Sequence, residues 1–91
     1  METKFTKGEW INIHGIIVPK DNIQHFIAKT YANSFGKDEN KANTSLIIAA
    51  PNMFNALLSI HDNSAIWDNL PQCHRDDIKK AIKKATNSLY L

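Results

Sequence analysis

The segment that most constrains the fold is Asn43 to Ile60, where apolar side chains recur at helical spacing around a central proline. Spacings of three and four residues give the stripe that a core-facing helix presents. We expect the large side chains of this stripe to form the core, each contributing about 1.5–3 kcal/mol by burial. The members of the stripe are Leu46, Ile47, Ala50, Met53, Phe54, Leu57 and Ile60.

Pro51 lies in the middle of this stripe and limits how the segment can be helical. Proline has no N–H to donate to the carbonyl of Ile47, and an interior proline costs about 3 kcal/mol. The residue before it, Ala50, is also pushed away from helical backbone angles. We therefore expect a bend at Pro51, either in one helix or between two helices with Pro51 in the first turn of the second.

Residues 9–31 predict three short antiparallel strands. The segment Glu9 to Val18, EWINIHGIIV, is rich in tryptophan, isoleucine and valine, and Gly15 suits a tight turn between two strands within it. Pro19 to Asn22 has the chemistry of a turn, and Ile23 to Tyr31 is typical of a third strand. Because a hairpin alone is marginally stable, we expect a helix to cover one face of this sheet.

The segments that flank the first helix predict connections. Residues 33–40 are polar and predict a loop, in which residues 38–40 can cap the helix that follows. Residues 61–72 lack sustained periodicity, so we expect a long connection with one helical turn around residues 64–67.

The C-terminal segment predicts a second helix that begins near Gln72 or Cys73 and ends near Ser88. Asp76 and Asp77 are expected to lie in its N-terminal turn, where negative charge is favourable. The complete prediction is an α+β fold: a three-stranded antiparallel sheet, a proline-bent helix and a C-terminal helix. The apolar stripe of the last helix consists of Ile78, Ala81, Ile82, Ala85 and Leu89.

Length and composition indicate a small soluble protein. A chain of 91 residues predicts one domain over residues 1–91, with a flexible polar entry over residues 1–8. The net charge of +2 is too small to indicate nucleic acid or membrane binding by itself. Cys73 is the only cysteine and the N-terminus lacks a signal-peptide core. The longest apolar run, residues 46–51, is far too short to span a bilayer, so we expect a cytoplasmic protein without membrane contact.

The sequence does not predict catalytic residues, a cofactor or a metal site. Cys73, His74 and His61 lack the paired spacings of a zinc site. His14 and His25 could face one another across strands, but two imidazoles are not a metal site. The paired carboxylates fall where helices are expected to start, and capping explains them. No glycine-rich phosphate loop or nucleophile elbow is present, so we do not expect an enzyme.

Two surfaces are candidates for a protein interface. One is a sheet face, where alternation places Trp10, His14 and Ile16 together, and where His25 can join them. The helices can cover only one face of the sheet, so apolar side chains could stay exposed on the other. The other candidate is the 61–72 connection with Trp67 at its centre, although an anchor in the core is the more common role for a tryptophan in such a place. An exposed sheet edge or face could also form a homodimer.

A basic face on the last helix is the alternative candidate. Its lysines could contact phosphates and give a salt-dependent affinity for nucleic acid. Aromatic residues do not interleave with these lysines in sequence, and arginine is nearly absent. A solvated helix face explains the same pattern. The residues concerned are Arg75, Lys79, Lys80, Lys83 and Lys84.

Three segments resemble a known group of proteins. Ala42 to Leu57, ANTSLIIAAPNMFNAL, is similar to the signature ANAxLIAAAPELLEAL of small phage and prophage accessory proteins. The stretch from Thr6 to Trp10 resembles their T-K-G-P-W opening, and residues 81–86 resemble their closing A-I-x-K-A-T helix. Among its departures from the signature, isoleucine replaces alanine at one position and asparagines replace glutamates at two others. These positions are Ile48, Asn52 and Asn55.

The resemblance implies a viral or prophage product that acts inside a bacterium, and it carries no catalytic residue. Proteins of this kind often interfere with host machinery or host defence. We therefore expect a non-enzymatic protein that binds and modulates or inhibits a host protein, including a defence component of the anti-phage or CRISPR type. The alternative is a small nucleic-acid-binding accessory protein that uses the basic face of the last helix.

Overall fold

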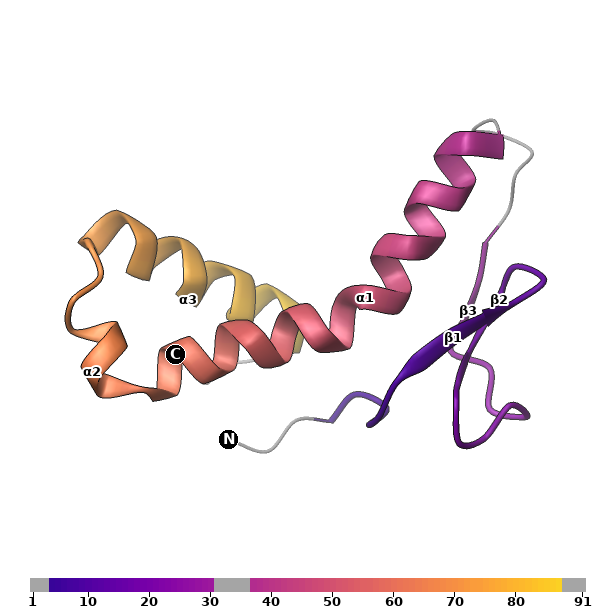
Figure 1. Cartoon of the computed structure of the whole chain (residues 1–91), viewed down its shortest axis with the longest axis horizontal. Coiled ribbons are helices and arrows are strands. Elements are labelled where there is room, and N and C mark those ends of the chain that lie inside the picture. Colours follow the sequence, from indigo (N-terminus) through magenta and orange to yellow (C-terminus); the bar gives the residue numbers. More distant parts are fainter. Residues whose placement is uncertain (1–3, 31–36, 88–91) are drawn as a thin grey trace. The chain divides into compact units, whose positions relative to one another are not determined.

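The computed structural model describes residues 4–30 and 37–87. It confirms the predicted α+β class, with a three-stranded antiparallel sheet of order β1-β2-β3, a long helix and a C-terminal helix (Figure 1). The elements are β1 (Trp10–Ile13), β2 (Ile16–Pro19), β3 (Ala28–Lys29), α1 (Lys37–Asp62), α2 (Ser64–Trp67) and α3 (Gln72–Thr86).

The chain divides into two compact units, and the division falls within α1, between Asn52 and Met53. The sheet unit consists of the described residues 6–52, and the helical unit consists of residues 4–5 with the described residues from 53 onward. Each unit is described by itself below. Residues 1–3 of the predicted flexible entry lie outside the described residues.

The turn between β1 and β2 forms where Gly15 predicts it. The two turn residues, His14 and Gly15, have left-handed backbone angles, with φ of 52° and 86°. The amide N–H of Gly15 donates to Oδ1 of Asn12 over 2.8 Å and closes the turn. A Cβ at Gly15 would lie 3.4 Å from the carbonyl oxygen of Thr30, so both backbone conformation and space favour glycine here.

The third strand is much shorter than predicted, because β3 contains only Ala28 and Lys29. The prediction of a strand from Ile23 is wrong because the chain makes two successive turns after β2. The N–H of Asn22 donates to the carbonyl of Pro19, and the N–H of His25 donates to the carbonyl of Asn22, both over 3.1 Å. These bonds close a loop over residues 20–27 that lies outside the sheet.

This loop also overturns the expected facing of two histidines across strands. His25 belongs to the loop and His14 to the turn between β1 and β2, so neither residue lies in a strand. The ladder between β2 and β3 pairs Ile16 with Lys29 and Ile17 with Ala28. Tyr31, the end of the predicted strand, lies outside the described residues.

The core of the sheet unit is centred on β2. Ile17 and Val18 of this middle strand are 0% and 1% exposed, and because successive side chains of a strand point to opposite faces, β2 is covered on both faces at these positions. On the helix, Thr44 and Pro51 are buried. The hydroxyl of Thr44 donates to the carbonyl of Asn40 over 2.8 Å, which satisfies a buried polar group.

Of the two alternatives at Pro51, one helix or two, the structure shows one, because α1 continues through the proline. Asp38 and Glu39 lie in the first turn of α1, where their charge is favourable. Because α1 begins at Lys37, residues 38–40 all lie inside the helix, so the predictions that one of them caps it and that residues 37–40 form a loop are wrong. Residues 33–36 of the predicted loop lie outside the described residues.

Of the seven residues of the predicted apolar stripe only Phe54 is buried; two others are exposed and the remaining four are half-buried. Leu46 is 59% exposed and Met53 is 47% exposed, whereas Phe54 is only 6% exposed. The predicted stripe was wider than the face of α1 that is covered. The buried positions Thr44, Pro51 and Phe54 are seven and three residues apart, so they lie on one side of the helix.

The helical unit has two buried apolar side chains among its described residues, Phe54 of α1 and Ile82 of α3. The rings of Phe54 and Phe5 meet edge to face with their centroids 5.2 Å apart. The helical turn predicted at residues 64–67 forms α2, and the side chain of Asn63 caps it by accepting from two backbone amides.

The C-terminal helix begins and ends close to where it is predicted. Pro71 occupies its N-cap position, and Asn87 ends it with left-handed backbone angles. The prediction for Asp76 and Asp77 is wrong, because the helix starts early enough to leave both beyond its first turn. Asp76 instead accepts a hydrogen bond from Nε2 of Gln72 over 2.7 Å. Leu89 lies outside the described residues.

Candidate protein-binding surface

The four residues predicted to share a sheet face separate into two groups. Trp10 and His25 meet at the end of the hairpin through Thr6. Nε1 of Trp10 donates to the carbonyl of Thr6 over 3.1 Å, and the Thr6 hydroxyl lies 3.5 Å from Nε2 of His25. His14 lies at the opposite end of the hairpin, where it is exposed, and half-buried Ile16 follows it at the start of β2.

Two large apolar side chains beside His25 are exposed. Phe26 is 68% exposed and Ile23 is 56% exposed. We call residues 23–26, which include both side chains and His25, the loop surface. These residues were not predicted to form a surface, because the sequence pattern predicted that they belong to a strand. The two apolar residues are three positions apart, which does not fit the alternation of a strand. This spacing was the sequence signal against a strand here.

The backbone under the loop surface is held by hydrogen bonds. In addition to the two turns at Asn22 and His25, the N–H of Gln24 donates to Oδ1 of Asn22 over 3.3 Å. The loop returns to the sheet where the N–H of Ile27 donates to the carbonyl of Ile17 over 2.8 Å. These bonds fix both ends of the loop, so little backbone entropy is left to lose when a partner binds.

An exposed ion pair lies at the first turn of the loop. Nζ of Lys20 lies 3.6 Å from Oε2 of Glu9, and both side chains are more than 60% exposed. The backbone N–H of Lys20 also donates to the carbonyl of Glu9 over 2.9 Å. An exposed pair of this kind contributes little to stability. Together with the loop surface it gives apolar side chains bordered by polar ones, which is the usual arrangement of a protein interface.

Trp67, the other predicted anchor, is half-buried and joins three helices of the helical unit. Its ring meets His61 of α1 edge to face with the centroids 4.9 Å apart. Nζ of Lys79 on α3 lies 5.9 Å from the centroid of the Trp67 ring, within cation–π range. The structure thus brings together Trp67 and Lys79, which belonged to different functional hypotheses in the sequence analysis.

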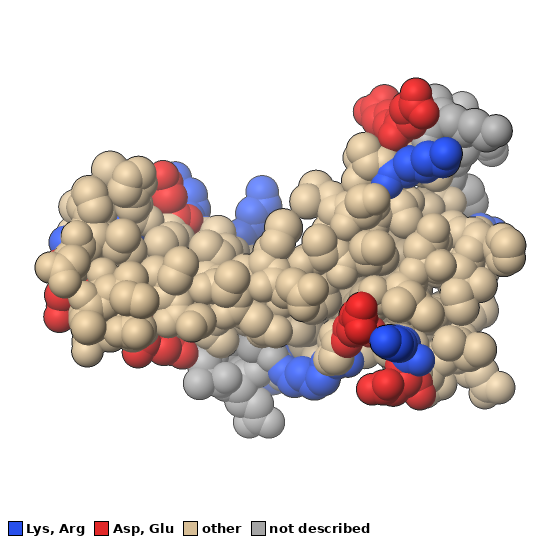
Figure 2. Space-filling view, in the orientation of Figure 1, with Lys and Arg blue, Asp and Glu red and all other residues tan. Residues whose placement is uncertain are grey.

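The four lysines of the predicted basic face are all exposed on α3, whereas Arg75 is half-buried. The buried Nε of Arg75 has no hydrogen-bond partner in the part of the chain that the structure describes. Lys83 and Lys84 lie in the last turn of α3, where positive charge favours the helix. On the face in view in Figure 2, coloured basic and acidic side chains form small separate groups.

Among residues 4–30 and 37–87, no three histidine, cysteine, aspartate or glutamate side chains gather as a metal site would require. Cys73 is free and exposed. Within the same described residues, none of the helices combines the length and the apolar character needed to span a bilayer.

Strand β1 forms one edge of the sheet, because the strand order is β1-β2-β3. Ile13 on this edge strand is 37% exposed. An exposed edge can pair with a strand of another chain, so the homodimer stays a prediction.

Comparison with known proteins gives a family. A family model described as Salmonella phage P22 protein Y8K6 matches residues 1–88 of the chain. Neither a curated protein nor a solved structure matches the chain. The matched region includes all three segments that resemble phage proteins. The match shows the family of the chain but assigns it no function.

Proposed function

This chain belongs to the family of Salmonella phage P22 protein Y8K6, and from that premise we propose that it is a non-enzymatic phage or prophage protein that binds a host protein in the bacterial cytoplasm and modulates or inhibits it. Components of host defence, including those of the CRISPR type, are the class of partner that we expect.

One observation carries this proposal: the loop surface presents Phe26 and Ile23 to solvent at 68% and 56% exposure. Exposing two large apolar side chains within one four-residue segment is unfavourable for an isolated protein. A few buried aromatic and aliphatic anchors supply most of the binding energy in protein interfaces. The hydrogen-bonded loop holds these two anchors before a partner arrives, which lowers the entropic cost of binding.

A pull-down from a bacterial host tests the proposal. Tagged wild-type protein is expected to retain a host protein in stoichiometric amount, and the variant I23S/F26S is expected to retain at least about tenfold less, because it removes two interface anchors. The matched control is Leu46→Ser, which removes an equally exposed apolar side chain from α1. Leu46→Ser is expected to retain the host protein at the wild-type level.

Circular dichroism and thermal unfolding of the purified variants show whether any loss reflects the interface. Because Ile23 and Phe26 are exposed, I23S/F26S is expected to unfold within a few degrees of wild type. Equal retention by wild type and a folded I23S/F26S variant would contradict the loop surface as the binding site. Absence of any stoichiometric host protein would contradict the proposed function itself.

Nucleic-acid binding is a second candidate, favoured by the position of Trp67 beside Lys79. Proteins that bind single strands combine cations that follow the phosphates with aromatic rings on which bases stack. Trp67 supplies the aromatic ring that the sequence of α3 lacks. It is half-buried, however, and its ring already contacts His61.

The charge-reversal variant K79E/K83E separates the two candidates. If the basic face binds single-stranded DNA, the reversal removes about two phosphate contacts and lowers the salt dependence of binding accordingly. The matched control is K20E/K41E, which makes the same change of net charge at two lysines of the sheet unit. Fluorescence anisotropy over a range of salt concentrations measures both effects. Equal binding by both variants would contradict this candidate, as would undetectable binding by wild type.

A further inference from the structure

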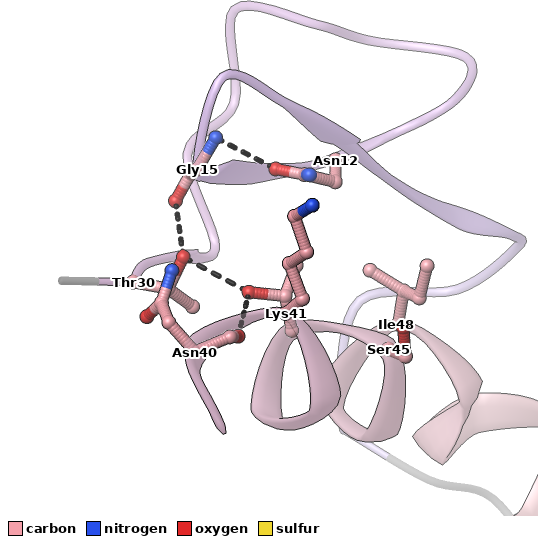
Figure 3. A pocket seen from close by; sticks show the side chains of 8 residues that line it. Asn12, Gly15, Thr30, Asn40, Lys41, Ser45 and Ile48 are labelled. Carbon is pink, nitrogen blue, oxygen red and sulfur yellow. Dashed lines mark hydrogen bonds between the residues drawn. The ribbon is translucent and has the colours of Figure 1, made fainter. Parts of the chain in front are cut away.

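A pocket of about 290 Å³ lies within the sheet unit and contains no residue of the loop surface in its lining (Figure 3). The hairpin side contributes Asn12 and Gly15 to its lining, and α1 contributes Lys41 and Ser45. Figure 3 shows the Lys41 side chain reaching from the helix toward Asn12. None of the eight described residues that line the pocket is acidic, so the charge at its wall is positive.

Two oxygen acceptors on the hairpin side of the pocket are already used by the protein. Oδ1 of Asn12 accepts from the Gly15 N–H over 2.8 Å. The Gly15 carbonyl accepts from both the N–H and the hydroxyl of Thr30, over 2.8 and 3.2 Å. The Thr44 hydroxyl lies 3.1 Å from the Thr30 hydroxyl (Figure 3). The Gly15 bonds link Thr30 to the hairpin, and the Thr44 contact links Thr30 to α1.

Three donors of the same wall have no such partner. Nζ of Lys41, Nδ2 of Asn12 and Oγ of Ser45 make no hydrogen bond or ion pair within the described residues. A wall with free donors, one ammonium group and no carboxylate matches an anionic ligand that accepts hydrogen bonds. A single positive charge balances a singly charged group better than a doubly charged phosphate. Ile48 adds an apolar part to the lining for the carbon atoms of such a ligand.

We propose that this pocket binds a carboxylate group, with Lys41 as its cation and Asn12 and Ser45 as neutral donors. The carboxylate can belong to a free small molecule or to an aspartate or glutamate side chain of a bound protein. This inference does not depend on the host-protein hypothesis, because it concerns a different part of the sheet unit and a different chemistry.

Nuclear magnetic resonance titration of the ¹⁵N-labelled full chain tests this assignment. The probes are sodium acetate, N-acetyl-glutamate methylamide, its neutral isostere N-acetyl-glutamine methylamide, and inorganic phosphate, all at constant ionic strength. Both carboxylates are expected to shift the amide signals of residues around Asn12, Lys41 and Ser45. The variant Lys41→Gln is expected to weaken this binding roughly tenfold or more, because it loses a charge-assisted hydrogen bond.

Lys80→Gln is the matched control, since it neutralises an exposed lysine on α3 and should leave the affinity unchanged. Tighter binding of the blocked glutamate than of acetate would point to a side chain as the source, and the reverse order to a free carboxylate. Equal effects of the glutamate and glutamine probes, tighter binding of phosphate, or an unchanged affinity in Lys41→Gln would overturn the proposal.

Discussion

Replacing Phe54 with alanine is expected to lower the free energy of unfolding of the protein by about 3–5 kcal/mol. Phe54 is 6% exposed and its ring packs edge to face against Phe5 with the centroids 5.2 Å apart. Truncation therefore removes a buried aromatic side chain, leaves a cavity and abolishes an aromatic pair. The change in the midpoint of urea unfolding, followed by circular dichroism, measures the loss.

Met53→Ala is the matched control, because Met53 precedes Phe54 in the same helix and is 47% exposed. Its truncation is expected to change stability by no more than about 1 kcal/mol, since much of the side chain already contacts water. Equal losses for Phe54→Ala and Met53→Ala would contradict the burial described for this part of α1. Both variants retain the loop surface and the pocket, so their effect is confined to stability.

Replacing Ile17 with alanine is expected to lower the free energy of unfolding by about 2–5 kcal/mol. Ile17 is fully buried on the middle strand, where it pairs with Asn12 on one side and Ala28 on the other. Loss of its side chain opens a cavity in the part of the sheet unit where the two ladders meet. In a chain of this size the loss corresponds to a fall in Tm on the order of 10 °C or more.

Ile23→Ala provides the comparison for Ile17→Ala, because it makes the same chemical change at a 56% exposed position of the same unit. It is expected to leave Tm nearly unchanged, since surface substitutions usually alter stability by about 0.5 kcal/mol or less. A fall in Tm at Ile23→Ala as large as that at Ile17→Ala would show that Ile23 is part of the core. It would also remove one anchor from the proposed interface.

The parts of the fold that could be predicted from sequence are those fixed by local chemistry. Gly15 adopts a backbone angle that favours glycine, and it predicted the hairpin correctly. Asn63 stands before a short helical turn as a side-chain cap, and α2 forms where it was expected. The single helix through Pro51 could not be predicted, because local preference for a break and tertiary packing of the flanking turns compete there.

The candidate sites depended on contacts that no local pattern records. Ile23 and Phe26 resemble strand residues in composition, and only the hydrogen bonds that close the loop place them on the surface. Leu46 satisfies helical spacing but lies outside the covered face of α1. The pairing of Trp67 with Lys79 joins residues of two helices, and the pocket joins a hairpin to a third helix. Contacts of this kind, between residues of different elements, are determined by tertiary packing and not by local sequence.

Membership of the phage family leaves the partner open, and the loop surface is where we expect it to bind. The most direct test is the mass-spectrometric ratio of host proteins retained by tagged wild type and by the folded I23S/F26S variant. We predict one host protein at stoichiometric level with wild type, and a ratio of at least about ten in favour of wild type. A ratio near one for every retained host protein would contradict the account.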